Sequence, residues 1–149
     1  MNWEAKSLDT IMEQKEYIDT ALIPLLLIEG SPEGMKQSAS ASEFLMNLTP
    51  FIEKQFKGRI VQFPPFSYTP GSDRNRLALE WKSELEKMTF KHYIFLTTDR
   101  GWTDEGILPE AIHIPSIPLE HMDKQVKTTV LQDQLRQLIP LLSKRWSDL

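Results

Sequence analysis

Residues 91–102 read Lys91-His92-Tyr93-Ile94-Phe95-Leu96-Thr97-Thr98-Asp99-Arg100-Gly101-Trp102. The first half is an apolar, aromatic and β-branched run without polar alternation, which is typical of a strand covered on both faces by helices. The second half brings hydroxyls, an acid, a base, a glycine and an indole into one loop. Ligands of open α/β sheets bind outside the carboxyl ends of the strands, so this loop lies where such a fold places its site.

The composition limits the class of protein. The chain of 149 residues contains no cysteine, which excludes disulfides, thiolate metal sites and thiol nucleophiles and fits a reducing compartment. Its net charge of −4 and pI of about 5.4, with acids and bases interspersed, disfavour nucleic acid as a partner. The N-terminus lacks the pattern of a signal peptide, and the longest apolar run, residues 21–28, is too short to span a bilayer. We therefore expect a cytoplasmic protein without membrane contact.

Three more apolar runs are predicted to be strands. Residues 21–28 suit a central strand, but Pro24 cannot donate to a ladder; either regular pairing begins near Leu25 or the side of the strand that Pro24 faces is unpaired. Residues 59–63 form a second strand, and the double proline after it places Phe66 and Tyr68 on a stiff loop. Residues 111–114 alternate briefly, as a short edge strand does.

Helices are predicted between these strands. Capping-box spacing, a threonine or serine followed three residues later by a glutamate, predicts helix starts at Thr10 and Ser40. Ser72 or Asp73 caps a third helix, in which Leu77, Trp81, Leu85 and Met88 recur on one face that is expected to pack on the sheet. A fourth helix carries an apolar stripe over residues 130–146.

Pro50 and Pro140 each fall inside a predicted helix, and the pattern leaves open whether they kink or break it. Strands that alternate with helices over short connections imply parallel pairing with right-handed crossovers. We therefore predict one domain, residues 1–149, with a three-layer α/β/α architecture of Rossmann-like or flavodoxin-like type. Its sheet is expected to be mainly parallel with about four strands.

A resemblance to a known family begins early in the chain. Residues 15–25 read Lys15-Glu16-Tyr17-Ile18-Asp19-Thr20-Ala21-Leu22-Ile23-Pro24-Leu25. This stretch is similar to the start of the YpiF-like family, small proteins of Gram-positive, spore-forming bacteria, and the apolar run before Thr98 and Asp99 agrees with it. The resemblance implies a bacterial cytosolic protein of unassigned function and supplies no catalytic residue.

If the first three strands are parallel, the loops that follow them share one edge of the sheet. The catalytic candidates there are Asp99, Arg100 and Glu29, since paired carboxylates can divide acid and base roles and an arginine can clamp a carboxylate or phosphate. The candidates for binding a ligand or a partner are Thr98, Trp102, Phe66 and Tyr68. The same residue types also cap helices and form turns, so a purely structural role is the competing interpretation.

Motifs that specify a reaction are missing. The sequence contains neither a glycine-rich nucleotide loop nor a nucleophile elbow, and its three histidines are scattered, so we expect no cofactor and no metal. This favours a non-enzymatic interaction or regulatory domain, monomeric or homodimeric, whose partner is a protein or a small molecule.

Two functional hypotheses remain, and geometry separates them. Contacts with a protein would come from aromatic residues near loops and termini, unless these rings close the ends of the core. These residues are Trp3, Phe63, Phe66, Tyr68, Trp102 and Trp146. The alternative is a small-ligand or phosphate-ester enzyme at the C-terminal edge of the sheet. Convergence of Glu29, Asp99 and Arg100 on one cleft would favour the enzyme, and a flat patch containing Phe66, Tyr68 and Trp102 would favour the protein partner.

Overall fold

A parallel pair of strands forms the centre of the sheet in the computed structural model, which describes residues 1–147. β1 (Thr20–Leu27) pairs with β4 (His92–Thr97) over six residue pairs. β5 (Ala111–His113) pairs with the other side of β4 and is the edge strand that the sequence predicts. The strand predicted within residues 91–102 is confirmed, and all strand pairs are parallel.

The opposite edge of the sheet is a single strand position broken in two. β2 (Ile60–Gln62) pairs with the first half of β1, and β3 (Phe66–Tyr68) pairs with its second half. The sheet therefore has five strands in four positions, in the order β2/β3, β1, β4, β5. The prediction that Phe66 and Tyr68 lie on a loop is wrong, because the double proline interrupts the edge strand without ending it.

Pro24 lies where its missing N–H is not needed. The Phe63 N–H donates to the Leu22 carbonyl and the Ile28 N–H donates to the Tyr68 carbonyl, both at 2.8 Å. Since backbone groups alternate in direction along a strand, Pro24 also faces the β2/β3 edge. It does so opposite the gap between β2 and β3, where no ladder bond would form. This confirms the alternative in which the side that Pro24 faces is unpaired.

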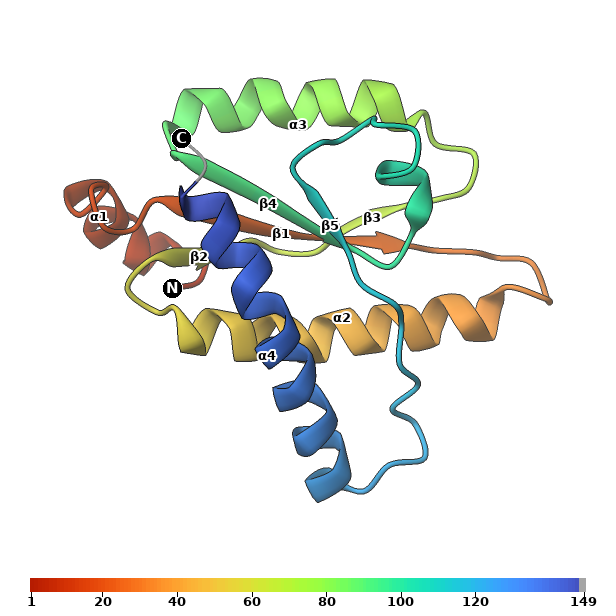
Figure 1. The fold of residues 1–149 in the computed structure, drawn as a ribbon. Coiled ribbons are helices and arrows are strands. Elements are labelled where there is room, and N and C mark those ends of the chain that lie inside the picture. Colours follow the sequence, from red (N-terminus) through yellow and green to blue (C-terminus); the bar gives the residue numbers. More distant parts are fainter. Residues whose placement is uncertain (148–149) are drawn as a thin grey trace.

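Helices cover both faces of the sheet (Figure 1). α2 (Met35–Gln55) and α4 (Lys124–Ser147) pack on one face, and α1 (Ala5–Glu13) and α3 (Arg74–Met88) pack on the other. Alternate side chains of β1 enter the two cores, so that Leu22 belongs to the first and Ile23 to the second. The predicted three-layer α/β/α architecture is confirmed.

The first helix begins earlier than its capping pattern predicts. α1 starts at Ala5, so Thr10 lies inside the helix and does not cap it. The chain before the helix is fixed to β2: the Gln62 N–H donates to the Met1 carbonyl at 2.7 Å, and the Trp3 N–H donates to the Gln62 carbonyl at 3.0 Å. This anchor ends just before Ala5 and therefore determines where α1 can start.

The second helix also starts ahead of its predicted cap. α2 begins at Met35, because Ser31 supplies the first-turn acceptors: its hydroxyl accepts the Gly34 N–H at 3.1 Å, and its carbonyl accepts the Met35 N–H at 2.9 Å. Ser40 is inside the helix, and its hydroxyl donates to Glu120 at 3.3 Å. The third helix begins as predicted, with the Asp73 carboxylate accepting the Arg76 N–H at 3.2 Å.

Neither internal proline breaks its helix. Pro50 lies within α2 and Pro140 within α4. A helical proline leaves the carbonyl four residues earlier without its usual partner, and here these carbonyls belong to Met46 and Arg136. Both residues are exposed, so water can take the place of the missing N–H.

We predict that β1 tolerates proline at position 24 but not at the neighbouring position. Pro24→Ala should lower the free energy of unfolding by at most about 1 kcal/mol, because only a restriction on the unfolded chain is lost. Ile23→Pro should destabilise the protein more than Ile23→Ala, which by itself costs about 2–5 kcal/mol, because the proline also removes a ladder bond to β4. Urea denaturation measures all three variants, and an Ile23→Pro protein as stable as Ile23→Ala would contradict the assigned register.

Candidate functional site

The sheet has a topological switch point between β1 and β4. β2 and β3 lie on one side of β1, and β4 and β5 lie on the other. The loops after β1 and β4 therefore diverge at their carboxyl ends, which is where open α/β sheets bind ligands. A cleft of about 240 Å³ lies at this position. Its lining residues are Leu27, Glu29, Gln37, Ser38, Ala41, Thr98, Asp99, Arg100 and Ser116.

Four residues predicted from the sequence line this one cleft. The catalytic candidates Glu29, Asp99 and Arg100 converge there with the binding candidate Thr98. The sequence located them correctly because each directly follows a strand that turned out to be parallel to its neighbour.

One wall of the cleft is built by contacts between β1 and α2. The Ser38 hydroxyl donates to the Leu27 carbonyl at 2.6 Å and accepts the Glu29 N–H at 3.0 Å, which ties the helix to the end of the strand. The Glu29 carboxylate folds back over the Cα of Gly34, where any Cβ would collide with it. Glycine at position 34 therefore lets Glu29 take its place in the cleft.

The opposite wall depends on Asp99, both of whose carboxylate oxygens are engaged. One oxygen accepts the Tyr68 hydroxyl at 2.5 Å and the Arg74 guanidinium at 2.7 Å. The other accepts the Gly101 N–H at 2.9 Å, which caps the short 3-10 turn Arg100–Trp102. Asp99 thus joins β3, α3 and the loop after β4.

These contacts shift the pKa values of Asp99 and Tyr68. Burial by itself raises the pKa of Asp99, but the hydrogen bonds from Tyr68, Arg74 and Gly101 together outweigh it and hold that pKa below its ordinary value. The pKa of the Tyr68 hydroxyl is raised by burial and by its hydrogen bond to the carboxylate. At neutral pH, Asp99 is therefore an ionised structural acceptor, and three of its roughly four acceptor positions are already used.

Arg100 is an exposed cation at the cleft. Its side chain is 67% exposed, and its nearest ion-pair partner is Asp104, at 3.9 Å. Exposed pairs of this kind contribute little to stability, so Arg100 is free to bind a ligand. It does not form a clamp on Asp99.

The side chains of Trp102 and Tyr68 are buried beneath the loop that follows β4. Their exposed fractions are 1% and 3%, and their rings meet edge to face with centroids 5.1 Å apart. Phe66 is only half-buried and lies elsewhere, against Trp81. The three aromatic binding candidates therefore form no common flat patch, and two of them serve the interior.

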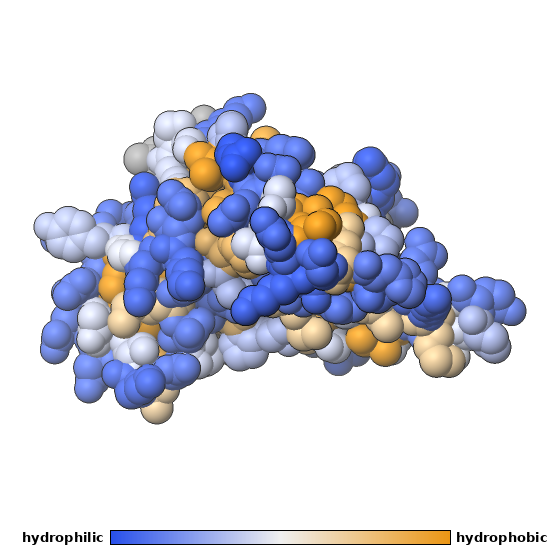
Figure 2. All heavy atoms as spheres, turned by 90° about the horizontal axis from the view of Figure 1, so that it is seen from below, coloured by the Kyte–Doolittle hydropathy of each residue, from blue (hydrophilic) through white to orange (hydrophobic). Residues whose placement is uncertain are grey.

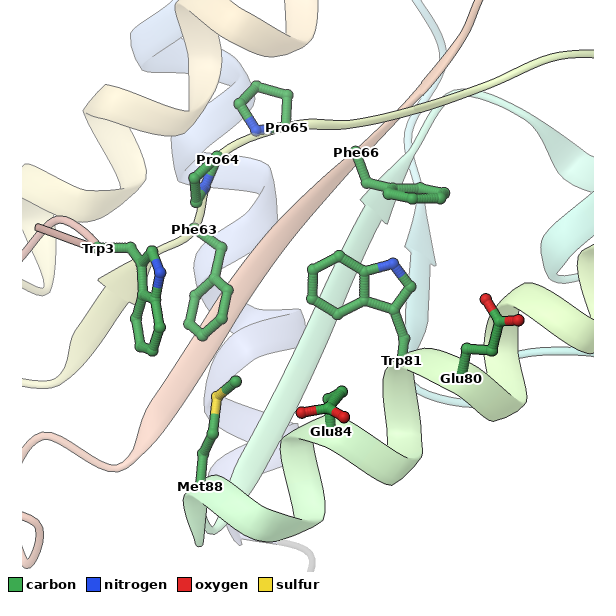
Figure 3. A pocket seen from close by; sticks show the side chains of 9 residues that line it. All are labelled: Trp3, Phe63, Pro64, Pro65, Phe66, Glu80, Trp81, Glu84 and Met88. Atoms are coloured by element: carbon green, nitrogen blue, oxygen red, sulfur yellow. The ribbon is translucent and has the colours of Figure 1, made fainter.

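A second hollow, the aromatic groove, lies beside the broken edge strand (Figure 3). Its volume is about 410 Å³, larger than that of the polar cleft. Its lining residues are Trp3, Phe63, Pro64, Pro65, Phe66, Glu80, Trp81, Glu84 and Met88. The groove thus unites the chain start, the double-proline segment and one side of α3.

Sequence reasoning found only part of this groove. It singled out Trp3 and the segment around Phe66 as possible contacts, but assigned Trp81 and Met88 entirely to the face of α3 that packs on the sheet. Both are only half-buried. The sequence signal for the groove was the indole of Trp81 on the same helical face as Leu77 and Leu85, with Glu80 and Glu84 beside it.

Residues 1–147 contain neither a cluster of metal-binding side chains nor a helix that could span a membrane. No group of three or more histidine, aspartate or glutamate side chains gathers there in a way that could hold a metal ion. No helix in this part of the chain combines the length and apolarity that crossing a membrane requires.

The fold and its hollows define a parallel α/β/α protein with a polar cleft at the switch point and an aromatic groove at the sheet edge. The chain belongs to the family described as Protein of unknown function (DUF2487), which matches residues 9–146. It is similar to the Uncharacterized protein YpiF of Bacillus subtilis (strain 168), with 32% identity over 152 residues that cover 100% of both chains. The resemblance to the YpiF-like family is thereby confirmed. No solved structure matches the chain.

We predict that Asp99→Asn lowers the free energy of unfolding at pH 7 by about 1.5–3 kcal/mol, since charge-assisted hydrogen bonds are lost. A depressed pKa stabilises the folded state above the unfolded value of about 3.9 and ceases to do so as the pH falls through the folded value. The difference between the wild type and Asp99→Asn should therefore shrink below about pH 4.

Urea denaturation at pH 7, 5 and 3 measures this difference. Asp104→Asn is the matched control, because Asp104 lies on the same loop with an exposed side chain, and its effect should be small throughout. A constant gap between the wild type and Asp99→Asn from pH 7 to pH 3 would refute the role given to the ionised carboxylate.

Proposed function

We propose that this protein is a non-enzymatic interaction domain that binds a protein partner through the aromatic groove. The observation that carries the proposal is a hollow of about 410 Å³, lined by aromatic rings and prolines, at the surface of the domain. Trp3 keeps 36% of its surface exposed there. Aromatic side chains that gather in such hollows are typical anchors of protein interfaces.

The opposite face of the molecule offers a weaker surface for docking. Viewed from the side of α2 and α4, the surface is largely hydrophilic, with apolar spots between charged side chains (Figure 2). Scattered exposed apolar residues of this kind are ordinary on proteins. The aromatic groove is therefore the better candidate for a specific contact.

The state of the polar cleft supports a role other than catalysis. A general base needs a free lone pair within reach of a substrate proton, whereas the carboxylate oxygens of Asp99 already accept three hydrogen bonds. Its depressed pKa also opposes protonation at neutral pH, so Asp99 is a poor general acid.

We predict that Trp3→Ala abolishes capture of the partner while the protein stays folded. The Trp3 ring stacks on Phe63 at the groove wall, with centroids 4.6 Å apart, whereas its backbone bond to Gln62 does not need the ring. The matched control is Leu79→Ala, an apolar residue of α3 that is 71% exposed and outside the groove. The measurement is affinity capture from a Bacillus extract, followed by calorimetric titration of each purified candidate.

A partner that binds the wild type and Leu79→Ala equally, but binds Trp3→Ala at least tenfold more weakly, supports the proposal. Equal binding by all three proteins would overturn it. The proposal includes a cytoplasmic location, which fractionation of cells that express a tagged chain would test.

A second candidate function is the binding of a small ligand in the polar cleft. It is favoured by the convergence of Glu29, Asp99 and Arg100 on one hollow, which Thr98 also lines; this convergence is the geometry expected of the enzyme alternative. Carboxylate and guanidinium groups together suit a small polar molecule that carries charge of its own.

For this second function, we predict a thermal shift that depends on Arg100. A ligand present at 100 times its Kd stabilises the protein by about 2.7 kcal/mol, equivalent to roughly 5–10 °C at this size. Thermal unfolding against a panel of nucleotides, sugar phosphates and polar metabolites provides the measurement. A shift that is lost in Arg100→Ala supports the cleft as a ligand site, and no shift across the panel counts against it.

A further inference from the structure

The walls of the aromatic groove are rigid ring surfaces. Trp3 stacks on Phe63 with an interplanar angle of 24°, and Phe66 meets Trp81 edge to face with centroids 5.6 Å apart. Figure 3 shows these two pairs next to each other, with Met88 below the first pair, and Phe63 of the first pair meets Trp81 of the second edge to face, with centroids 6.4 Å apart. Flat, preorganised walls of this kind suit a ligand that is itself stiff and presents flat apolar rings.

The groove offers little backbone hydrogen bonding along one side. Pro64 and Pro65 line it, and neither has an N–H to donate. A β-strand added at this place would lose donors that strand pairing requires. A polyproline II segment has no such need, because its backbone is extended and solvated, and aromatic-lined grooves are its usual receptors.

The charge at the groove is acidic. Glu80 and Glu84, one helical turn apart on α3, are its only charged lining residues in the part of the chain described. Each carboxylate now pairs with an exposed cation of its own helix, Arg76 at 3.1 Å and Lys87 at 2.8 Å. Exposed pairs of this kind are worth at most about 1 kcal/mol, so a cation on the ligand can replace them.

We infer that the groove binds an extended, proline-rich peptide segment that carries arginine or lysine. Its prolines pack along the wall that the Trp3–Phe63 and Phe66–Trp81 pairs form together, since Phe63 meets Trp81 edge to face, and its basic side chain pairs with Glu80 and Glu84. An arginine gains in addition from the face of Trp81, since guanidinium groups are attracted to indole rings. This inference rests on the proposed function and specifies the chemistry of its partner.

Three sets of synthetic ten-residue peptides test the inference by fluorescence polarisation. Each peptide of the first set repeats a unit that has prolines at its first and fourth positions and varied residues between them. Each of these peptides ends in two arginines. The second set replaces the prolines by alanine, and the third replaces the arginines by glutamate. We expect micromolar Kd values for members of the first set and at least tenfold weaker binding for their counterparts in the other two.

Variants of the full chain place the binding at the groove. The double variant Glu80→Gln, Glu84→Gln keeps the shape of the groove and removes its charge. It should weaken the binding of the arginine peptides at least fivefold and should not weaken the binding of the glutamate peptides. Trp3→Ala should weaken the binding of every peptide that binds the wild type, and Leu79→Ala should leave the Kd of each peptide unchanged. Thermal unfolding confirms that each variant is folded before it is titrated.

Three results would overturn the inference: alanine peptides that bind as tightly as proline peptides, glutamate peptides that bind as tightly as arginine peptides, or no binding by the first set up to 1 mM. None of these affects the capture experiment with Trp3→Ala. If a captured protein depends on Trp3 while the proline peptides fail, the groove is an interaction site for another kind of segment. If nothing depends on Trp3, the proposed function itself is overturned.

Discussion

The parallel ladder between β1 and β4 fixes the positions of both cores and of the polar cleft. Every residue from Ala21 to Leu26 is buried, and the side chains enter the two helical layers in alternation. A slip of one residue would exchange the two sets of side chains and bury the wrong face. The same register determines where the loops after β1 and β4 meet, so the packing of the cores also places Glu29 opposite Thr98 and Arg100.

At the carboxyl end of β4, structure and reactivity draw on the same carboxylate. Asp99 lies where α/β proteins place catalytic groups, but it orders its loop by accepting hydrogen bonds from Tyr68, Arg74 and Gly101. Three of the roughly four acceptor positions of this carboxylate are therefore used within the protein. Arg100, next in the chain, is exposed and only loosely paired, so any ligand chemistry of the cleft depends on it and on Glu29.

The sequence predicts the layers of this fold better than its helix starts. The burial of β4 and the apolar face of α3 follow from long, consistent patterns, and the parallel arrangement follows from the alternation of elements. Capping boxes at Thr10 and Ser40 are short patterns, and neither marks the start of its helix. The pairing of Met1 and Trp3 with Gln62 fixes the start of α1, and the turn at Ser31 fixes the start of α2. The cleft could be located from strand ends alone, whereas the groove joins segments that only the fold brings together.

The double proline after β2 links the stability of the sheet to the presence of the groove. By interrupting the edge strand, it leaves a gap opposite Pro24, so a proline in the central strand costs no ladder bond. The same interruption lets Phe63 and Phe66 both meet Trp81 edge to face, and Phe63 stacks in addition on Trp3. A continuous strand would have to pair residues 63–65 with β1 and would meet the missing N–H of Pro24 there. The break in the edge strand therefore satisfies the backbone of β1 and also places the aromatic rings that line the hollow.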